Sequence, residues 1–137
     1  MIMILSSGKI LELNKKYNLL ENLSERETSN PEGVGIDIRV GEVYRLEGEG
    51  YLGETERKTP EAKKIADIKN GDKFFVLKPG ELVLIKTIER INVPAEKISI
   101  EEGSESRHLM AHPYPRTTLQ RSGVFFRGCW TPKRQRR

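Results

Sequence analysis

The chain has 137 residues, 36% of them hydrophobic, which is enough for one compact domain with its own core. Five of its 24 arginine and lysine residues lie in residues 127–137, so residues 1–126 hold 19 basic and 20 acidic residues. This near-neutral balance argues against a broad nucleic-acid-binding face. No stretch approaches the roughly 20 apolar residues that span a membrane, and the single cysteine, Cys129, cannot form an internal disulfide, so we expect a cytoplasmic protein.

The N-terminal region predicts a short helix and then a strand. Ser6 and Ser7 are candidate caps, and the apolar residues after them recur at spacings of three and four, at Ile10, Leu13, Tyr17 and Leu20. In residues 36–41 apolar residues alternate with polar residues or glycine. This is the period of a half-buried strand, in which Asp37 and Arg39 share one face.

The middle of the chain predicts a polar excursion and then a hairpin. Residues 45–72 are polar, and within them Thr59-Pro60-Glu61 predicts the cap and first turn of a brief helix through Ile65 and Ile68. The apolar runs 74–77 and 82–87 flank Lys78-Pro79-Gly80-Glu81. Proline at the second position and glycine at the third favour a type II turn.

The C-terminal third predicts two further strands, one around Ile98 and Ile100 and one in residues 123–126. Residues 101–115 show no assignable pattern. We therefore expect a mostly β domain over residues 1–126, a barrel or sandwich with few helices, followed by a basic, disordered tail in residues 127–137.

The segment PRTTLQRSGVFF, residues 115–126, gathers anion-binding side chains. A strand would place Arg116 and Arg121 on opposite faces, whereas a helix beginning near Thr117 would bring both threonines close to Arg121. Its first N–H groups would lie beside the hydroxyls, with Leu119 toward the core, and arginines can add bidentate bonds to phosphate. From the residues alone, an ordinary capped turn with solvated arginines is the alternative.

Several segments resemble the dCTP deaminase and dUTPase superfamily, in the family's order. PRTTLQRSGV resembles its second motif, in which an arginine and two hydroxyl residues precede leucine, a second arginine and glycine. Residues 3–6 followed by a helix resemble the deaminase N-terminus, and PEGVGIDIRVGEVY (31–44) resembles the first motif, which contains an aspartate. FVLKPGELVLIKTIERINVP (75–94) resembles the hairpin between the motifs.

The resemblance implies a distorted, dUTPase-like β-barrel that assembles as a homotrimer and binds nucleotide at its subunit interfaces. It assigns triphosphate binding to Arg116, Thr117, Thr118 and Arg121, and it places Thr117 and Arg121 beside the reacting base in supporting catalytic roles. It also implies that Asp37 helps to position Mg²⁺ through water. A solvated or Arg39-paired aspartate is the alternative.

The form of the two motifs favours dCTP deamination, which yields dUTP or dUMP and ammonia, over dUTP diphosphatase activity. No zinc is expected, because the chain lacks the His and Cys pattern of the zinc deaminases. The resemblance implies instead a glutamate from a third motif as the proton-transfer group.

That third motif has no counterpart, because RGCWTPKRQRR (127–137) contains no glutamate, and residues 101–114 exceed what the family carries there. A truncated or frame-shifted gene that retains phosphate binding is one interpretation, and a shortened relative with a binding or regulatory role is the other.

Other chemically distinctive residues receive plainer interpretations. His108 and His112 lack a third metal ligand and are expected on the surface, and Cys129 has no base to activate it. Trp130 with Lys133–Arg137 offers a third functional alternative, nucleic-acid binding through the tail. Solvated positions on strand edges and loops are expected for Glu81, Glu89 and Glu96.

Overall fold

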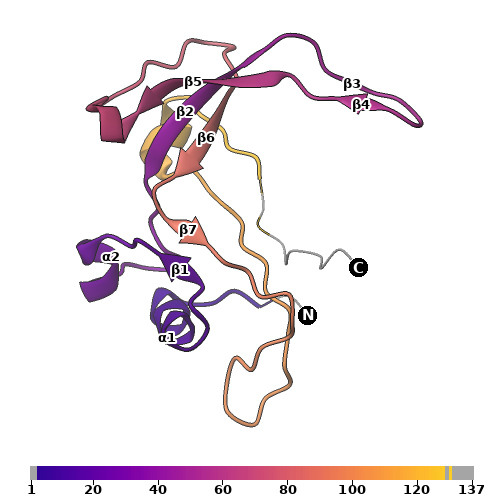
Figure 1. Ribbon diagram of the computed structural model, residues 1–137. Helices are drawn as coiled ribbons and strands as arrows, with labels where there is room; N and C mark the ends of the chain where they lie inside the picture. The colour runs from indigo at the N-terminus through magenta and orange to yellow at the C-terminus, as the bar shows by residue number, and fades with distance from the viewer. Residues whose placement is uncertain (1–2, 129, 131–137) are drawn as a thin grey trace. The chain divides into compact units, whose positions relative to one another are not determined.

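The structure is a computed structural model that describes residues 3–128 and 130 (Figure 1). The chain divides into two compact units: unit 1 is Met1–Ile36 with Arg90–Arg137, and unit 2 is Asp37–Glu89. The described strands form three antiparallel sheets, ordered β1-β7, β5-β2-β6 and β3-β4. The mostly β class with a few short helices is therefore confirmed, although these sheets are open and no closed barrel forms among the described residues.

Unit 1 begins with helix α1, Ser7–Tyr17, as predicted. The hydroxyl oxygen of Ser6 accepts a hydrogen bond from the Lys9 N–H, which satisfies one of the donors that a helix start leaves open. The helix ends at Asn18, whose φ of 50° is left-handed. Leu20, which the periodicity placed on the helix, lies instead in strand β1, and the Asn14 side-chain oxygen accepts from its N–H at 2.6 Å.

The core of unit 1 is a cluster of buried aliphatic residues drawn from distant parts of the sequence: Leu13, Leu19, Ile98 and Ile100. Strand β1, Leu20–Glu21, pairs with β7, Arg90–Ile91. Helix α2, Glu25–Ser29, is capped by the Ser24 hydroxyl. The strand predicted around Ile98 is reduced to an isolated bridge with Arg107, although Ile98 and Ile100 are buried as a strand of the core would be.

Unit 2 is built around strand β2, Val40–Glu47, which pairs with β5, Glu61–Asp67, on one side and with β6, Val83–Thr87, on the other. Strands β3, Tyr51–Leu52, and β4, Arg57–Lys58, form a separate two-stranded arm. The 3-10 helix η1, Ile68–Asn70, follows β5.

Two predictions for the strands of unit 2 are wrong, and the second has a clear physical cause. The strand expected from Ile36 begins only at Val40, and the helix expected after Thr59-Pro60-Glu61 is strand β5. β5 pairs with β2 over six register positions, from Glu47↔Glu61 to Glu42↔Asp67. Pairing between segments far apart in sequence therefore overrides the local capping signal.

The two apolar runs beside the turn at Lys78–Glu81 behave differently. The Glu81 N–H donates to the Lys78 C=O at 3.0 Å and Gly80 has φ 76°, so the turn is confirmed. Residues 82–87 supply β6, but residues 74–77 belong to no strand. Residues 123–126 also form no strand, and Phe125 is exposed, contrary to the sequence pattern.

No helix within residues 3–128 is long and apolar enough to cross a membrane. Lys133–Arg137 and Cys129, on which the tail and thiol hypotheses depend, lie outside the described residues.

Candidate functional site

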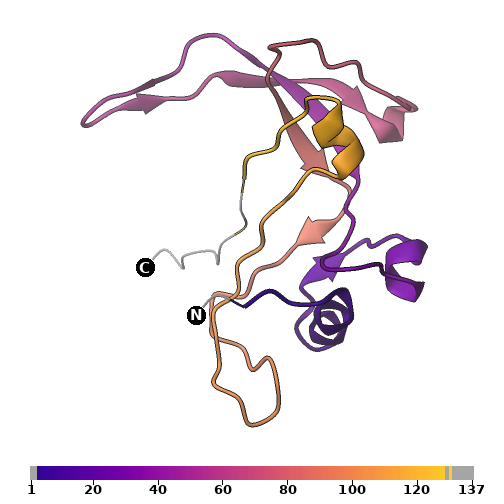
Figure 2. The ribbon, with the colours of Figure 1, turned by 180° about the vertical axis from the view of Figure 1, so that it is seen from behind.

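The predicted helical turn is present as α3, Thr117–Arg121, near the C-terminal end of the described chain (Figure 2). Arg116 precedes it in an extended conformation, with φ −59° and ψ 152°. The Arg116 C=O accepts the N–H groups of Leu119 at 2.9 Å and Gln120 at 3.0 Å, which closes the first turn. The segment that carries the two arginines and two threonines therefore folds locally, as its sequence predicts.

Gly123 ends this turn. The Gly123 N–H donates to the Gln120 C=O at 3.0 Å and the Val124 N–H donates to the Leu119 C=O at 2.9 Å, which is the paired hydrogen-bond arrangement of a Schellman motif. Gly123 has φ 77°, a conformation that a residue with a Cβ adopts only with strain. The glycine two residues after Arg121 is thus explained by backbone geometry.

The four predicted phosphate-binding side chains, those of Arg116, Thr117, Thr118 and Arg121, are all exposed. No side chain caps the helix start, so the threonine hydroxyls are not used as the caps that the sequence suggested. Leu119 is 39% exposed and does not face a core, which corrects another expectation. The turn consequently presents two hydroxyl donors and two cationic side chains to solvent, within one stretch of six residues.

Asp37, the predicted Mg²⁺ residue, belongs to unit 2 and is half-buried just before β2. The structure thus brings together the four residues of the 116–121 turn, while Asp37 stands in a different unit. One carboxylate, completed by water and substrate phosphates, is a usual way of binding Mg²⁺, so Asp37 fits that role in the presence of a triphosphate. Among residues 3–128 and 130, no group of three or more His, Cys, Asp and Glu could hold a metal, and His108 and His112 are exposed.

Glu89 is a residue that sequence reasoning placed wrongly. Its side chain is fully buried, and its two oxygens accept the Arg39 Nε–H and the Arg39 backbone N–H, each at 2.7 Å. The Arg39 C=O accepts the Ile88 N–H at 2.9 Å, so both backbone polar groups of Arg39 are held. A charged residue two positions after the run 82–87 is the only signal in the sequence. Glu89 thus fixes the chain two residues after Asp37.

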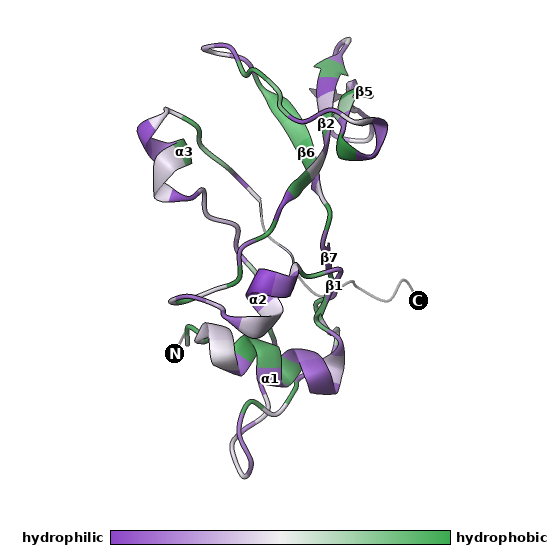
Figure 3. Ribbon diagram, turned by 90° about the vertical axis from the view of Figure 1, so that its left-hand side faces the viewer, coloured by the Kyte–Doolittle hydropathy of each residue, from purple (hydrophilic) through white to green (hydrophobic). Residues whose placement is uncertain are grey.

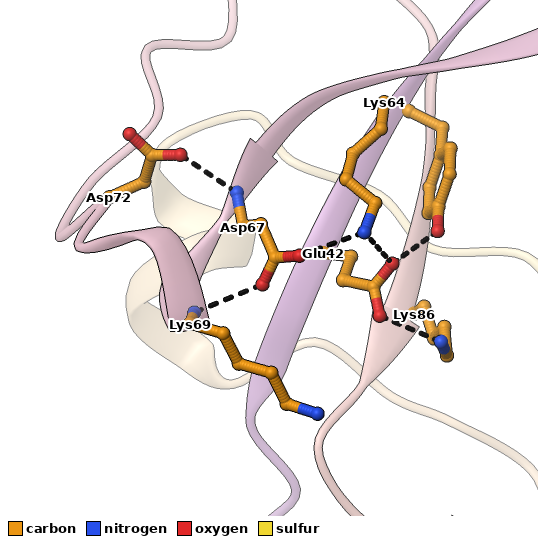
Figure 4. A network of polar contacts seen from close by, with 7 residues as sticks. Glu42, Lys64, Asp67, Lys69, Asp72 and Lys86 are labelled. Atoms are coloured by element: carbon orange, nitrogen blue, oxygen red, sulfur yellow. Dashed lines mark hydrogen bonds and ion pairs between the residues drawn. The ribbon is translucent and has the colours of Figure 1, made fainter.

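A second polar network lies on the sheet of unit 2 (Figure 4). Glu42 on β2 binds Lys64 of β5 at 2.8 Å and Lys86 of β6 at 2.7 Å, and it also accepts from the Tyr44 hydroxyl. Lys64 also binds Asp67 at 2.8 Å. The hydrogen bonds from Lys64, Lys86 and Tyr44 lower the pKa of Glu42 to about 2. Sequence reasoning missed this network because its members lie on three strands.

Comparison with known proteins shows which family the chain is similar to. A family model described as dCTP deaminase-like matches residues 4–131. The dUMP-forming dCTP deaminase of Dictyoglomus thermophilum is 29% identical over 107 residues, 76% of this chain and 55% of that protein. The deoxyuridine 5'-triphosphate nucleotidohydrolase of Methanocaldococcus jannaschii is 27% identical over 117 residues, 84% of this chain and 64% of that protein.

The dCTP deaminase of Shewanella amazonensis is 32% identical over 97 residues, 58% of this chain and 50% of that protein. This chain therefore spans between half and two thirds of the length of the relatives that it matches. No solved structure matches it at a significant level.

Proposed function

Because the chain belongs to the dCTP deaminase-like family, we propose that it binds a pyrimidine deoxynucleoside triphosphate, dCTP, through Arg116, Thr117, Thr118 and Arg121. The observation that carries the proposal is the exposed cluster of two guanidinium groups and two hydroxyls on a turn closed by Gly123. The relatives named as dCTP deaminases and as a dUTP nucleotidohydrolase support a pyrimidine deoxynucleotide as the ligand.

Each side chain has a distinct role in this proposal. The planar guanidinium groups of Arg116 and Arg121 donate paired hydrogen bonds to phosphate oxygens, which a point-charge cation does less specifically. Hydroxyl groups of Thr117 and Thr118 donate to the remaining oxygens. Thr117 and Arg121 additionally border the base. Asp37 holds Mg²⁺ through water when the triphosphate is bound, and the metal neutralises part of the phosphate charge.

A homotrimer with the nucleotide at subunit interfaces is part of the same proposal. The relatives' names favour deamination of dCTP as the family activity, with dUTP diphosphatase activity as the second candidate. A noncatalytic role, in which the chain binds the nucleotide without converting it, is a further alternative, so turnover is the property to be measured.

The purified chain incubated with dCTP or dUTP, with ammonia and diphosphate release followed, separates these functions. Binding of dCTP without release of either product supports the noncatalytic role. Ammonia release from dCTP would establish deamination, and diphosphate release from dUTP would establish the second candidate. Absence of binding to both nucleotides would contradict the proposal.

Arg121→Ala tests the binding site directly. Removal of a charge-assisted bidentate donor should weaken dCTP binding by about tenfold to 100-fold in titration calorimetry with Mg²⁺ present. Arg57→Ala is the matched control, since Arg57 is an exposed arginine on β4 and should leave the affinity unchanged. Equal affinity in Arg121→Ala and the unaltered chain would show that the site is wrongly placed.

A further inference from the structure

The extended segment that leads into α3 has two faces of different character. From residue 107 to residue 116, half-buried and exposed residues alternate without a break, which is the period of an extended chain. The exposed face carries five side chains: His108, Met110, His112, Tyr114 and Arg116. Arg116, the first residue of the proposed phosphate-binding group, therefore has the aromatic side chain of Tyr114 as its next neighbour on the same face.

Contacts within unit 1 fix which face of this segment is exposed. Arg107 exchanges two backbone hydrogen bonds with Ile98, at 2.8 and 2.9 Å, and Ile98 belongs to the buried aliphatic cluster. Ala111 exchanges two with Trp130, at 2.9 and 2.8 Å. Leu109, on the half-buried face, packs against the aliphatic cluster. The half-buried face is thus anchored to the rest of unit 1, and the opposite face is left to solvent.

Tyr114 is 82% exposed, yet its neighbours hold it in place. It lies between Pro113 and Pro115, and each proline fixes its own φ and favours an extended conformation in the residue before it. The Pro115 C=O accepts from the Gln120 side chain at 2.8 Å, which ties the segment to α3. The His112 and Tyr114 ring centroids are 6.5 Å apart, within the range in which aromatic rings attract. A large ring is therefore presented to solvent on a backbone with little freedom.

The spacing along the exposed face suits a nucleotide. Two residues of extended chain span about 6.6 Å, so Tyr114 and Arg116 are separated by a length that a deoxyribose bridges between phosphate and base. The segment runs directly into α3, which is coloured mostly neutral to hydrophilic in Figure 3. Cationic and hydroxyl groups for phosphate and a flat aromatic ring for a base are thus neighbours, a combination with which proteins hold nucleic-acid components.

We propose that Tyr114 stacks on the base of the nucleotide whose phosphates the 116–121 turn binds. This inference rests on the function proposed above, and it adds a residue that precedes the segment resembling the second motif. Every nucleobase has a π face, so stacking raises the affinity without selecting cytosine over uracil. Tyr114 therefore strengthens the binding of dCTP and dUTP equally, and the neighbouring ring of His112 restricts the orientation of the tyrosine ring.

The test compares dCTP with inorganic tripolyphosphate, which has the phosphates but no base, in titration calorimetry of the full chain with Mg²⁺ present. Tyr114→Ala should weaken the binding of dCTP, and equally of dUTP, by about fivefold to 100-fold and leave that of tripolyphosphate unchanged. Tyr114→Phe should keep the affinity for dCTP, because stacking needs the ring and not the hydroxyl. Tyr51→Ala is the matched control, since Tyr51 is 53% exposed but lies on the β3-β4 arm of unit 2.

Stacking and phosphate binding can fail separately. Unchanged dCTP affinity in Tyr114→Ala, or an equal loss in Tyr51→Ala, would overturn the stacking role and leave the phosphate site standing. A single-stranded oligodeoxynucleotide that binds more tightly than dCTP and depends on Tyr114 would also overturn it, because the exposed face would then belong to nucleic acid. If the unaltered chain binds neither dCTP nor tripolyphosphate, the proposed function and this inference are both wrong.

Discussion

Units 1 and 2 are stabilised by different kinds of interaction. Unit 1 buries the aliphatic cluster that includes Leu13 and Ile98, and Tyr17 of α1 and Leu20 of β1 pack against it. Unit 2 buries one apolar side chain, Val43, among its described residues and relies on the β5-β2-β6 ladder and on ion pairs. Apolar burial is non-directional, whereas strand ladders and ion pairs specify register.

This difference bears on the two parts of the proposed site. The 116–121 turn belongs to the unit with an apolar core, and its conformation is set by hydrogen bonds within residues 115–124. Asp37 belongs to the other unit, and the chain just after it is held by one buried carboxylate, that of Glu89. Substitutions can therefore affect the two parts separately.

Leu13→Ala, in the core of unit 1, should cause the largest loss of stability among the variants considered. Leu13 is 2% exposed, so its truncation removes buried apolar contacts and leaves a cavity, and the free energy of unfolding should fall by about 2–5 kcal/mol. This free energy is measured by urea unfolding followed through the fluorescence of Trp130, which is the only tryptophan of the sequence and belongs to unit 1. Leu52→Ala, at an exposed position, should change this free energy by less than about 0.5 kcal/mol; similar losses in both variants would contradict the assigned core.

Glu89→Gln probes unit 2 and should have the next largest effect. A glutamine oxygen can accept only one of the two Arg39 donors, and its NH₂ group then faces the other, so we expect a loss of about 1–3 kcal/mol in unfolding free energy. Glu47→Gln is the matched control, because Glu47 pairs with Lys63 at the surface and such pairs contribute little. The stability of both variants is measured by amide hydrogen exchange of the β2 residues. Equal protection in the two variants would mean that the buried carboxylate of Glu89 stabilises the fold no more than the surface carboxylate of Glu47.

Local features of the fold were predictable from the sequence, and pairing across long separations was not. The Ser6 cap and the α1 periodicity act within a few residues, as do the turn at Pro79-Gly80 and the turn closed by Gly123. β5 was mistaken for a helix because its partner, β2, lies far away in sequence and the Thr59-Pro60-Glu61 signal is local. FFVL was predicted as a strand because its composition is right, but a strand also needs a neighbour.

The candidate site shows the same division between local and long-range features. The four residues proposed to bind phosphate lie within six consecutive positions, so their spacing alone could place them on one turn. Glu89 and its partner Arg39 are 50 positions apart, and Glu42 is 44 positions from Lys86. No periodicity in the sequence connects such positions, and only the register of β2 with β6 brings Glu42 and Lys86 together.

The smallest expected effect concerns the titration of Glu42. It tests whether the ion pairs of unit 2 control the pKa of this carboxylate. The pKa of Glu42 is lowered to about 2 from an ordinary 4.5, chiefly by Lys64. Because the pKa is lower in the folded state, the stabilising contribution is present above pH 4.5 and is lost as the pH falls toward 2. In a carboxyl ¹³C NMR titration, Lys64→Met should raise the pKa of Glu42 toward 4.5. Lys63→Met, one residue away and paired with Glu47, should leave it near 2, so equal titration curves in the two variants would show that the Lys64 contact does not control this carboxylate.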